Sequence, residues 1–306
     1  MNVLGKKKII IETNDFKICL DNNDKSCDFS FLSHAHSDHL FKSKKPVISS
    51  DATIELAKIR GYNFERLNNV PENISLIDNG HMLGSKALII NEDKESLVFT
   101  SDFSTRNRGF INGFKPIKCN KLIIESTFGN PFFLFPDYSS EMKRAKDFVE
   151  DNLKKDYLTV FMGYPLGKIQ EIQHYFNDSN SSVHEKILPY NNAYENFGIN
   201  LGTKKNIEDA NILFSPLMRT NNNFFNKIKQ VRGVKFGVFS GWNLNPSYKN
   251  RFLADEGFTI SDHADFKDLL KVVHKSKASE IFVHHGSSKE FVEFLKMEGF
   301  NATNLD

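Results

Sequence analysis

The sequence is poor in cysteine, in tryptophan and in net charge. It has three Cys and one Trp in 306 residues, and 40 basic against 38 acidic side chains leave a formal net charge of +2. The three cysteines (Cys19, Cys27 and Cys119) are too few for a disulfide framework, and their wide spacing excludes a zinc site made of cysteine alone. The balanced charge excludes a histone-like or polybasic protein, although a local basic groove is compatible with it.

Long apolar runs are also missing. No stretch approaches the ~18 apolar residues of a membrane span, and the first residues lack the apolar segment of a signal peptide. With 40% apolar and 25% charged residues, the composition is that of a soluble globular chain. We therefore expect a cytoplasmic protein in a reducing compartment, without membrane contact and with about two domains at ~150 residues each.

The hydrophobic pattern changes at about residue 135. Before that point short strands follow one another with few helices, and after it strands and helices alternate, which is typical of a parallel α/β unit. The predicted strands are 8–13, 16–21, 29–33, 47–49, 74–77, 86–91, 97–100, 121–125, 157–162, 186–188, 211–215, 235–240 and 280–284. The predicted helices are 52–60, 139–153 with Ser140 as a candidate cap, 167–176, 248–254, 266–275 and 290–298.

A histidine-rich segment carries the strongest chemical signal. Residues 34–39 read His-Ala-His-Ser-Asp-His and follow an apolar strand directly. Imidazole and carboxylate together suit zinc and similar divalent metals. With ten histidines in 306 residues, the odds of this pattern by chance are on the order of one in a thousand per chain. We therefore interpret the segment as metal-binding and not as a polar surface loop.

Three further residues supply what a two-metal site still needs. His81 lies in a turn before a strand, Asp102 follows a strand, and His285 ends one in His284-His285-Gly286. Each alone is compatible with an ordinary loop or turn. Together they fall in tight turns or at the carboxyl ends of strands, where α/β active sites gather. The two oxygens of Asp102 suit it to bridge a pair of ions.

These motifs resemble a known family. Residues 34–39, His81 and Asp102 are similar to successive motifs of the metallo-β-lactamase fold, and Asp21 matches the aspartate that braces the metal site in that family. Segments 124–129, 261–265 and 284–286 resemble motifs A, B and C of the β-CASP nuclease branch, with Glu125, His263 and His285 at the functional positions. The resemblance covers essentially the whole chain. It is closest to DNA-ligase-associated exonucleases and archaeal mRNA 3′-end processing factor-like exonucleases.

The resemblance implies an α/β protein of two domains. A four-layer αββα metallo-β-lactamase domain would comprise residues 1–133 and 253–306. An α/β β-CASP cap domain, residues 134–252, would be inserted between the two pieces. The active site is then expected in the cleft between the domains.

The resemblance also implies two zinc ions, with manganese as an alternative, and a role for each motif residue. The first ion would take His34, His36, His81 and Asp102, and the second Asp38, His39, Asp102 and His285. His263 would protonate the leaving oxygen, with Asp38 and Glu125 as further catalytic residues. Glu125 would orient a neighbouring histidine, and Asp21 would support the metal ligands from behind.

The implied function is zinc-dependent hydrolysis of phosphodiesters in single-stranded RNA or DNA. Artemis-type DNA enzymes carry Asp at motif A and lack the metal-binding His at motif C, whereas this chain has Glu125 and His285. That difference favours an exonuclease of RNA processing. A DNA-repair exonuclease, of the ligase-associated or Artemis-like kind, is the alternative, because the ligase-associated enzymes share the Glu and the His. A catalytically inactive structural subunit is the third interpretation, although such subunits lose metal ligands.

Two residues outside these motifs are candidates for substrate binding. Residues 163–168 resemble a phosphate-binding loop, but the spacing is one residue short and no Ser or Thr follows Lys168, which excludes an ATPase. Lys168 and the amides at the start of the next helix are candidates for holding a backbone phosphate, and a simple helix-entry turn is an equal interpretation. Ser240 lies in a Ser-Gly-Trp segment similar to one in the same exonucleases.

Overall fold

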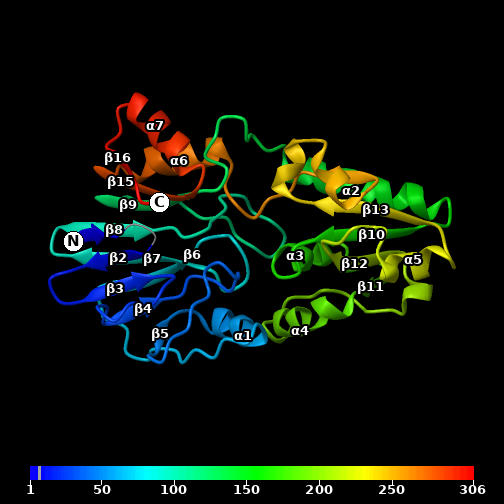
Figure 1. The fold of residues 1–306 in the computed structure, drawn as a ribbon, viewed down its shortest axis with the longest axis horizontal. Coiled ribbons are helices and arrows are strands. Elements are labelled where there is room, and N and C mark those ends of the chain that lie inside the picture. The colour runs from blue at the N-terminus through cyan, green and yellow to red at the C-terminus, as the bar shows by residue number, and fades with distance from the viewer. Residues whose placement is uncertain (6–7) are drawn as a thin grey trace. The chain divides into compact units, whose positions relative to one another are not determined.

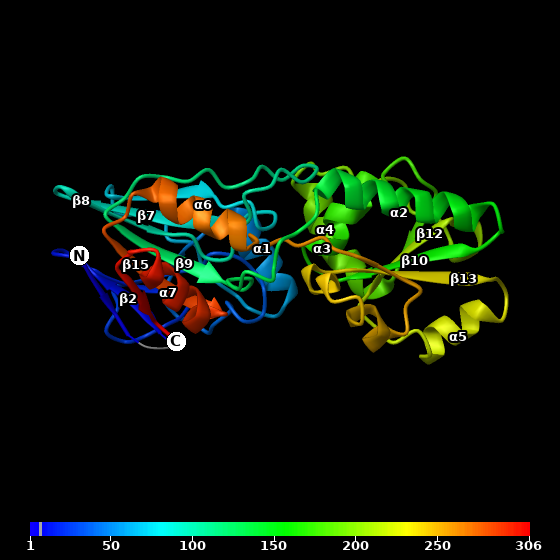
Figure 2. The same ribbon diagram turned by 90° about the horizontal axis from the view of Figure 1, so that it is seen from above.

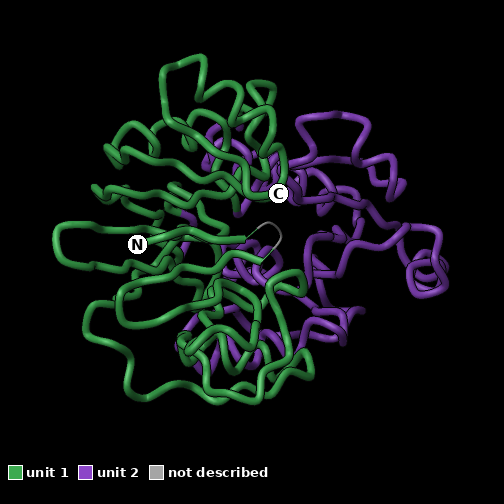
Figure 3. The backbone as a smooth tube through the Cα atoms, turned by 60° about the vertical axis from the view of Figure 1, so that its left-hand side comes forward, with its two compact units in different colours: residues 1–107, 111–134, 263–306 green, residues 108–110, 135–262 purple. Residues whose placement is uncertain are grey.

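The chain divides into two compact units, which Figure 3 shows in different colours. The computed structural model describes residues 1–5 and 8–306. Unit 1 comprises residues 1–107, 111–134 and 263–306, and unit 2 comprises residues 108–110 and 135–262. The second boundary therefore falls after residue 262, whereas the sequence placed it after residue 252. The reason is β14 (Glu256–Phe258), which pairs with β13 (Val234–Phe239) and so extends the sheet of unit 2.

Unit 1 contains two β-sheets (Figure 1). The first has the order β1 (Asn2–Leu4), β2 (Ile9–Glu12), β3 (Lys17–Leu20), β4 (Phe29–Phe31) and β5 (Val47–Ile48). The second has the order β16 (Ala302–Asn304), β15 (Glu280–Gly286), β9 (Lys121–Ser126), β8 (Glu95–Phe99), β7 (Lys86–Glu92) and β6 (Ile74–Asp78). Its helices are α1 (Asp51–Ile59), α6 (Phe266–Ser276) and α7 (Ser288–Met297).

Alternating side chains on β9 divide the core of unit 1 into two halves. Ile123 is buried between the two sheets, among apolar residues of β2, β3, β4, β7 and β8. Its neighbours Leu122 and Ile124 point to the other face, where they pack against side chains of α6 and α7. Figure 2 shows these two helices beside β9 and β15. The central sheet is thus buried on both faces, which explains its nearly continuous apolar strands.

Unit 2 is a parallel sheet with helices on both faces. The strand order is β11 (Ser181–Val183), β12 (Ile212–Pro216), β10 (Leu158–Gly163), β13 and β14, and every pair is parallel. Side chains of α2 (Tyr138–Leu153) and α3 (Lys168–Tyr175) pack on one face, and those of α5 (Asn223–Lys229) on the other. The remaining helices are α4 (Leu188–Asn196), η1 (Glu185–Ile187), η2 (Ile207–Asp209), η3 (Gly241–Leu244) and η4 (Tyr248–Phe252).

The mixed α/β class predicted from the sequence is confirmed, but α4, β1, β14 and β16 were not predicted, and two predicted features are misplaced. The predicted strand 186–188 falls in η1 and the start of α4, because His184 caps η1 and Pro189 starts α4 with its fixed φ; the strand lies at Ser181–Val183 instead. The predicted cap Ser140 lies within α2, whose N-cap is Asp137, with its carboxylate accepting from the Ser140 amide.

Cys19 and Cys27 are joined by a disulfide bond, and Cys119 is free and buried. The low cysteine count gave no indication of this single bond, because pairing depends on distances that the sequence does not reveal. Cys19 lies in β3 and Cys27 in the loop before β4, two strands that pair in parallel, which brings their Cα atoms to 5.9 Å.

Among the residues that the structure describes, no helix combines the length and the apolar character that crossing a membrane requires.

Candidate metal centre

The histidine-rich segment lies at the carboxyl end of β4 in unit 1. The backbone continues the sheet as far as Leu32, whose amide donates to Ile48, and a turn follows in which the His39 amide donates to His36. Leu32 and Ala35 are fully buried and fix the segment against the core. His34 is buried as well, His36 is partly exposed and Asp38 is exposed.

Four of the predicted ligands converge. His34, His36, His81 and Asp102 each place one ligand atom within 4.8 Å of the others. The Nε2 atoms of His34 and His81 lie 3.6 and 4.0 Å from Asp102 Oδ2, and His81 Nε2 lies 3.0 Å from His36 Nδ1. The loops after β4, β6 and β8 bring these residues together, although His34 and Asp102 are 68 positions apart in the sequence (102 − 34).

This cluster fits a metal ion. His34 Nε2 and Asp102 Oδ1 are buried and have no hydrogen-bond partner among the described residues. Buried polar atoms rarely remain without a partner, since each costs about 1–3 kcal/mol. Three imidazole nitrogens and a carboxylate oxygen within 4.8 Å of one another are a donor set that divalent transition metals prefer.

A second group shares Asp102 with the first. His39 Nε2 lies 3.2 Å from Asp102 Oδ2 and 3.9 Å from Asp38 Oδ2. The rings of His39 and His285 have their centroids 6.3 Å apart. Asp38, His39 and His285 line a hollow of about 170 Å³ in unit 1, with Asp21 and Asp306 at its wall. Asp102 therefore contacts side chains of both groups.

Asp21 supports both groups from behind. Its carboxylate accepts from the Ser33 amide and hydroxyl, at 2.7 Å each, and from His39 Nδ1 at 2.8 Å. Ser33 Oγ is also 2.9 Å from His34 Nδ1. Because Ser33 gives its proton to Asp21, His34 Nδ1 must be the donor in that contact. Both rings are thereby held with their Nε2 atoms directed into the cluster.

The same contacts set the charges of the cluster. Burial lowers the pKa of His34 well below its usual value, so this imidazole is neutral, as a ligand must be. Burial alone would also lower the pKa of His39, but the carboxylates of Asp102 and Asp21 outweigh it and raise that pKa well above the usual value. The charge on His39 in turn contributes to a pKa of Asp102 well below its ordinary value despite burial. Without a metal, the protonated His39 and the Asp102 carboxylate therefore form an ion pair. A bound cation would take the place of the proton between them.

Glu125 and His263 form a second pair beside the cluster. Glu125 is fully buried, and its Oε1 lies 2.9 Å from His263 Nδ1. The amides of Phe103 and Thr127 donate to the same carboxylate at 3.1 and 2.9 Å. Burial would raise the pKa of Glu125, but the charge and hydrogen bond of His263 outweigh it and lower that pKa. The His263 ring is 4.8 Å from that of His81, centroid to centroid.

His284 and His285 differ in orientation. His284 is buried, packs its ring against Phe99 at 5.5 Å and leaves Nε2 without a hydrogen-bond partner among the described residues. Burial lowers its pKa to about 4, so the ring is neutral at pH 7. His285 sits at an irregularity in the β15–β9 pairing, with φ of 65°. A Cβ on Gly286 would lie 2.4 Å from Thr127 Cα, so only glycine allows this close approach.

Three residues around the site have left-handed backbone geometry. Asp21, Ser101 and His285 have φ values of 48°, 49° and 65°, although none is glycine. Such strain gathers at functional sites, where the surrounding structure holds it in place. Ser33 and Ser101 were not foreseen from the sequence. Ser101 Oγ donates to Ser33 Oγ at 2.7 Å, and only its position directly before Asp102 gave a signal.

The two predicted substrate-binding residues have other partners in unit 2. Lys168 is buried, with its amine 3.3 Å from Glu171 and 3.7 Å from Asp262, and Arg108 also pairs with Glu171. The prediction that Lys168 offers its amine to a phosphate is corrected accordingly, since burying the charge requires those carboxylates. Ser240 is buried too and caps η3, accepting from the Trp242 amide.

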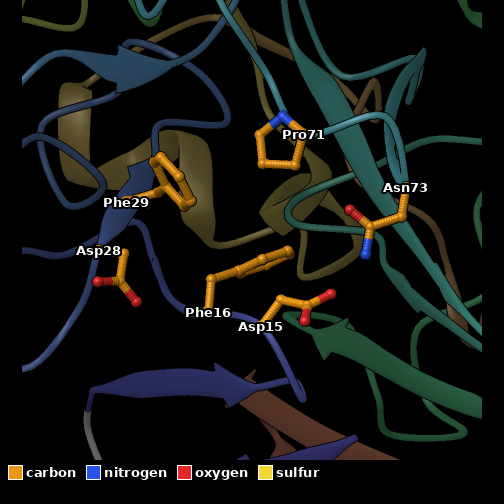
Figure 4. Close-up of a pocket in the computed structure, with 6 residues that line it drawn as sticks. All are labelled: Asp15, Phe16, Asp28, Phe29, Pro71 and Asn73. Carbon is orange, nitrogen blue, oxygen red and sulfur yellow. The ribbon is translucent and has the colours of Figure 1, made fainter.

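Another hollow in unit 1 lacks this chemistry. It measures about 410 Å³ and is lined by Asp15, Phe16, Asp28, Phe29, Pro71 and Asn73 (Figure 4). Two carboxylates face two aromatic rings, and the lining contains neither histidine nor a basic side chain. Its charge is unfavourable for an anionic substrate.

Comparisons with known proteins give distant relatives. No family model matches the chain. It is similar to a protein of Opitutus terrae named probable DNA ligase, with 27% identity over 291 residues, 89% of this chain and 28% of the relative. An RNase J-like protein of Methanocaldococcus jannaschii is 22% identical over 216 residues, 55% of this chain and 51% of the relative. The chain thus spans between 28% and 51% of these curated relatives.

The solved structures include a similar fold. A protein of unknown function from Enterococcus faecalis superposes with a TM-score of 0.60 at 15% identity, covering 92% of this chain and 91% of that one. At this identity the likeness concerns the α/β fold alone.

Proposed function

We propose that this chain is a metal-dependent nuclease of the β-CASP branch of the metallo-β-lactamase superfamily. The observation that carries the proposal is the shared Asp102, with buried histidines on both sides and the Glu125–His263 pair beside it. The relatives support it by name, because one is called a ligase of DNA and the other an RNase. Unit 1 would be the metallo-β-lactamase domain, its two sheets and flanking helices the four layers, and unit 2 the β-CASP cap.

Zinc, or manganese in its place, would be held by two sets of ligands. His34, His36, His81 and Asp102 form the first set, and Asp38, His39, Asp102 and His285 the second. Bound zinc supplies Lewis-acid chemistry that activates water and offsets phosphate charge. The chain prepares the ligands itself, since Asp21 and Ser33 fix the histidine tautomers.

His263 is the group placed to manage the leaving oxygen. Glu125 holds its Nδ1, which fixes the ring and leaves Nε2 to carry a proton. When the P–O bond of a phosphodiester breaks, the departing oxygen takes that proton, which is general acid catalysis. The buried amides of Phe103 and Thr127 keep the Glu125 carboxylate in position.

RNA and DNA are both candidate substrates. Glu125 and His285 favoured RNA, whereas the similarity to the probable DNA ligase extends over 89% of this chain and that to the RNase J-like protein over 55%. The longer alignment supports DNA, which remains the alternative to RNA. It occupies only 28% of that relative, so the name ligase describes a much longer protein.

One experiment tests the proposal. Purified protein is given single-stranded RNA, single-stranded DNA and duplexes, each labelled at the 5′ or the 3′ end, and metal content is measured by mass spectrometry. We expect about two metal ions per chain and cleavage of single strands. Asp102→Ala should abolish cleavage and lower metal content, whereas Asp78→Ala, an exposed aspartate paired with Lys86, should change neither. Full metal content and activity in the Asp102 variant would refute the site.

A further inference from the structure

A basic and aromatic hollow in unit 1 is separate from the metal centre. It measures about 670 Å³, a size typical of ligand sites, and the loops after β3, β4 and α1 form it. Its lining consists of Asn23, Asp24, Lys25, Phe41, Lys42, Ser43, Lys44, Lys45, Gly61, Tyr62, Asn63 and Phe64. We call these residues the lysine–aromatic hollow.

The lysines of this hollow have positive charge to offer. Lys25, Lys42 and Lys44 are exposed, and none of them pairs with a carboxylate among the described residues. The fourth, Lys45, donates to the carbonyl of Cys27 and so fixes the rim. The lining contains one carboxylate, Asp24, and this group is paired with Lys8 at 3.3 Å. The hollow is therefore complementary to an anion, unlike the acidic hollow of Figure 4.

Three aromatic rings line the same hollow. Tyr62 and Phe64 have nearly parallel rings, with 8° between their planes and centroids 6.2 Å apart. Phe41 meets Phe64 edge-on, at 5.2 Å and 67°. All three side chains are only partly buried, so ring surface remains accessible. Flat rings beside unpaired lysines are the combination that single-stranded nucleic acids require, because bases stack and phosphates are neutralised.

The chain connects this hollow directly to the metal ligands. Phe41 follows His39 by two residues, which limits their Cα atoms to about 7 Å, and Lys44 follows it by five, which allows at most about 18 Å. A few nucleotides cover that distance. We propose that the lysine–aromatic hollow binds nucleotides of a single strand next to the cleaved bond. Bases stack on Tyr62, and phosphates pair with the amines of Lys42 and Lys44. This inference rests on the proposed nuclease function.

Binding is tested without cleavage. Fluorescence anisotropy follows a twelve-nucleotide single strand with a hydrolysis-resistant phosphorothioate backbone over a range of salt concentrations. Tyr62→Ala should weaken binding about 5- to 100-fold, whereas Tyr62→Phe, which keeps the ring, should bind normally. Lys42→Gln with Lys44→Gln should reduce the slope of log K against log salt by about 1.4. The control Lys94→Gln with Lys118→Gln removes two exposed lysines elsewhere in unit 1 and should leave the slope unchanged.

A second measurement separates this inference from the nuclease itself. Bis(p-nitrophenyl) phosphate has a phosphodiester but no bases, so the Tyr62 and lysine variants should hydrolyse it at the normal rate while losing kcat/KM on a twelve-nucleotide strand with an ordinary, cleavable phosphodiester backbone. A chain that cleaves no phosphodiester would refute the nuclease, and the anisotropy would still decide the binding site. Equal binding by wild type and Tyr62→Ala, or equal competition by polyglutamate, would overturn the hollow as a nucleic-acid site.

Discussion

At the residue scale, His263 is distinguished from the histidines around it by its partner. Glu125 holds its Nδ1 at 2.9 Å, whereas the ligand histidines contact Asp102 or one another. His263→Ala should therefore keep the bound metal and lose about 10²- to 10⁴-fold in rate. The loss should shrink on a substrate with a p-nitrophenolate leaving group, which needs no proton.

Steady-state kinetics on both substrates, with metal analysis, check this prediction. His274→Ala is the matched control, because His274 is exposed on α6 and contacts Phe300. An equal loss on the two substrates would indicate that His263 acts in binding or in structure.

His284 and His285 offer a test of register at the same scale. His285→Ala should lower the affinity for the second metal and abolish cleavage, whereas His284→Leu should keep the metal. Because the pKa of His284 is about 4 in the folded chain and about 6.5 in the unfolded chain, only the unfolded state binds a proton between these values. Stability from this group is therefore lost as the pH falls from 6.5 to 4, by about 3 kcal/mol.

Urea unfolding in EDTA between pH 4 and pH 7 measures this effect. His284→Leu should show a shallower decline in the free energy of unfolding than the wild type. Parallel pH profiles, or metal loss in His284→Leu with an active His285→Ala, would refute the assigned register.

At the scale of elements, the loop between β3 and β4 is closed by the Cys19–Cys27 bond and contains Asp21. The two cysteines are eight positions apart, so reducing the bond should lower stability by about 2–3 kcal/mol in the chain-entropy account. Thiol titration of the unfolded, unreduced protein should find one free thiol, that of Cys119. Urea unfolding with and without reductant measures the stability change.

Cys119→Ala provides the control for this bond. It removes the free thiol and should leave the effect of reductant unchanged. Three free thiols in the unreduced protein would show that the bond does not form in solution.

At the scale of the whole molecule, all seven proposed ligands belong to unit 1. EDTA should abolish cleavage and zinc should restore it. Hydrogen exchange after zinc addition should slow around residues 34–39, 81, 102 and 285, because binding at a hundredfold excess over Kd stabilises the folded state by about 2.7 kcal/mol. Unit 2 should show no direct protection.

Mass spectrometry of exchanged peptides measures this protection. Asp102→Ala supplies the reference, since zinc should no longer slow exchange in that variant. Protection confined to unit 2 would place the metal elsewhere.

Elements that depend on short-range chemistry were predictable from the order of the residues. Apolar alternation placed most strands, and the spacing within residues 34–39 indicated a metal-binding segment, because both are properties of neighbouring residues. The sequence was less reliable where the same residues are compatible with a strand and with a helix, as in the misplaced strand 186–188.

Contacts between groups far apart in the chain became visible with the folded structure. Asp21 reaches Ser33 and His39, Cys19 reaches Cys27, and Lys168 is taken up by Glu171 and Asp262. Composition and spacing cannot reveal these contacts, because strand pairing and burial fix them across the chain. The basic lysine–aromatic hollow is of the same kind: its three loops are unremarkable separately, and only their folding together collects unpaired lysines around accessible rings.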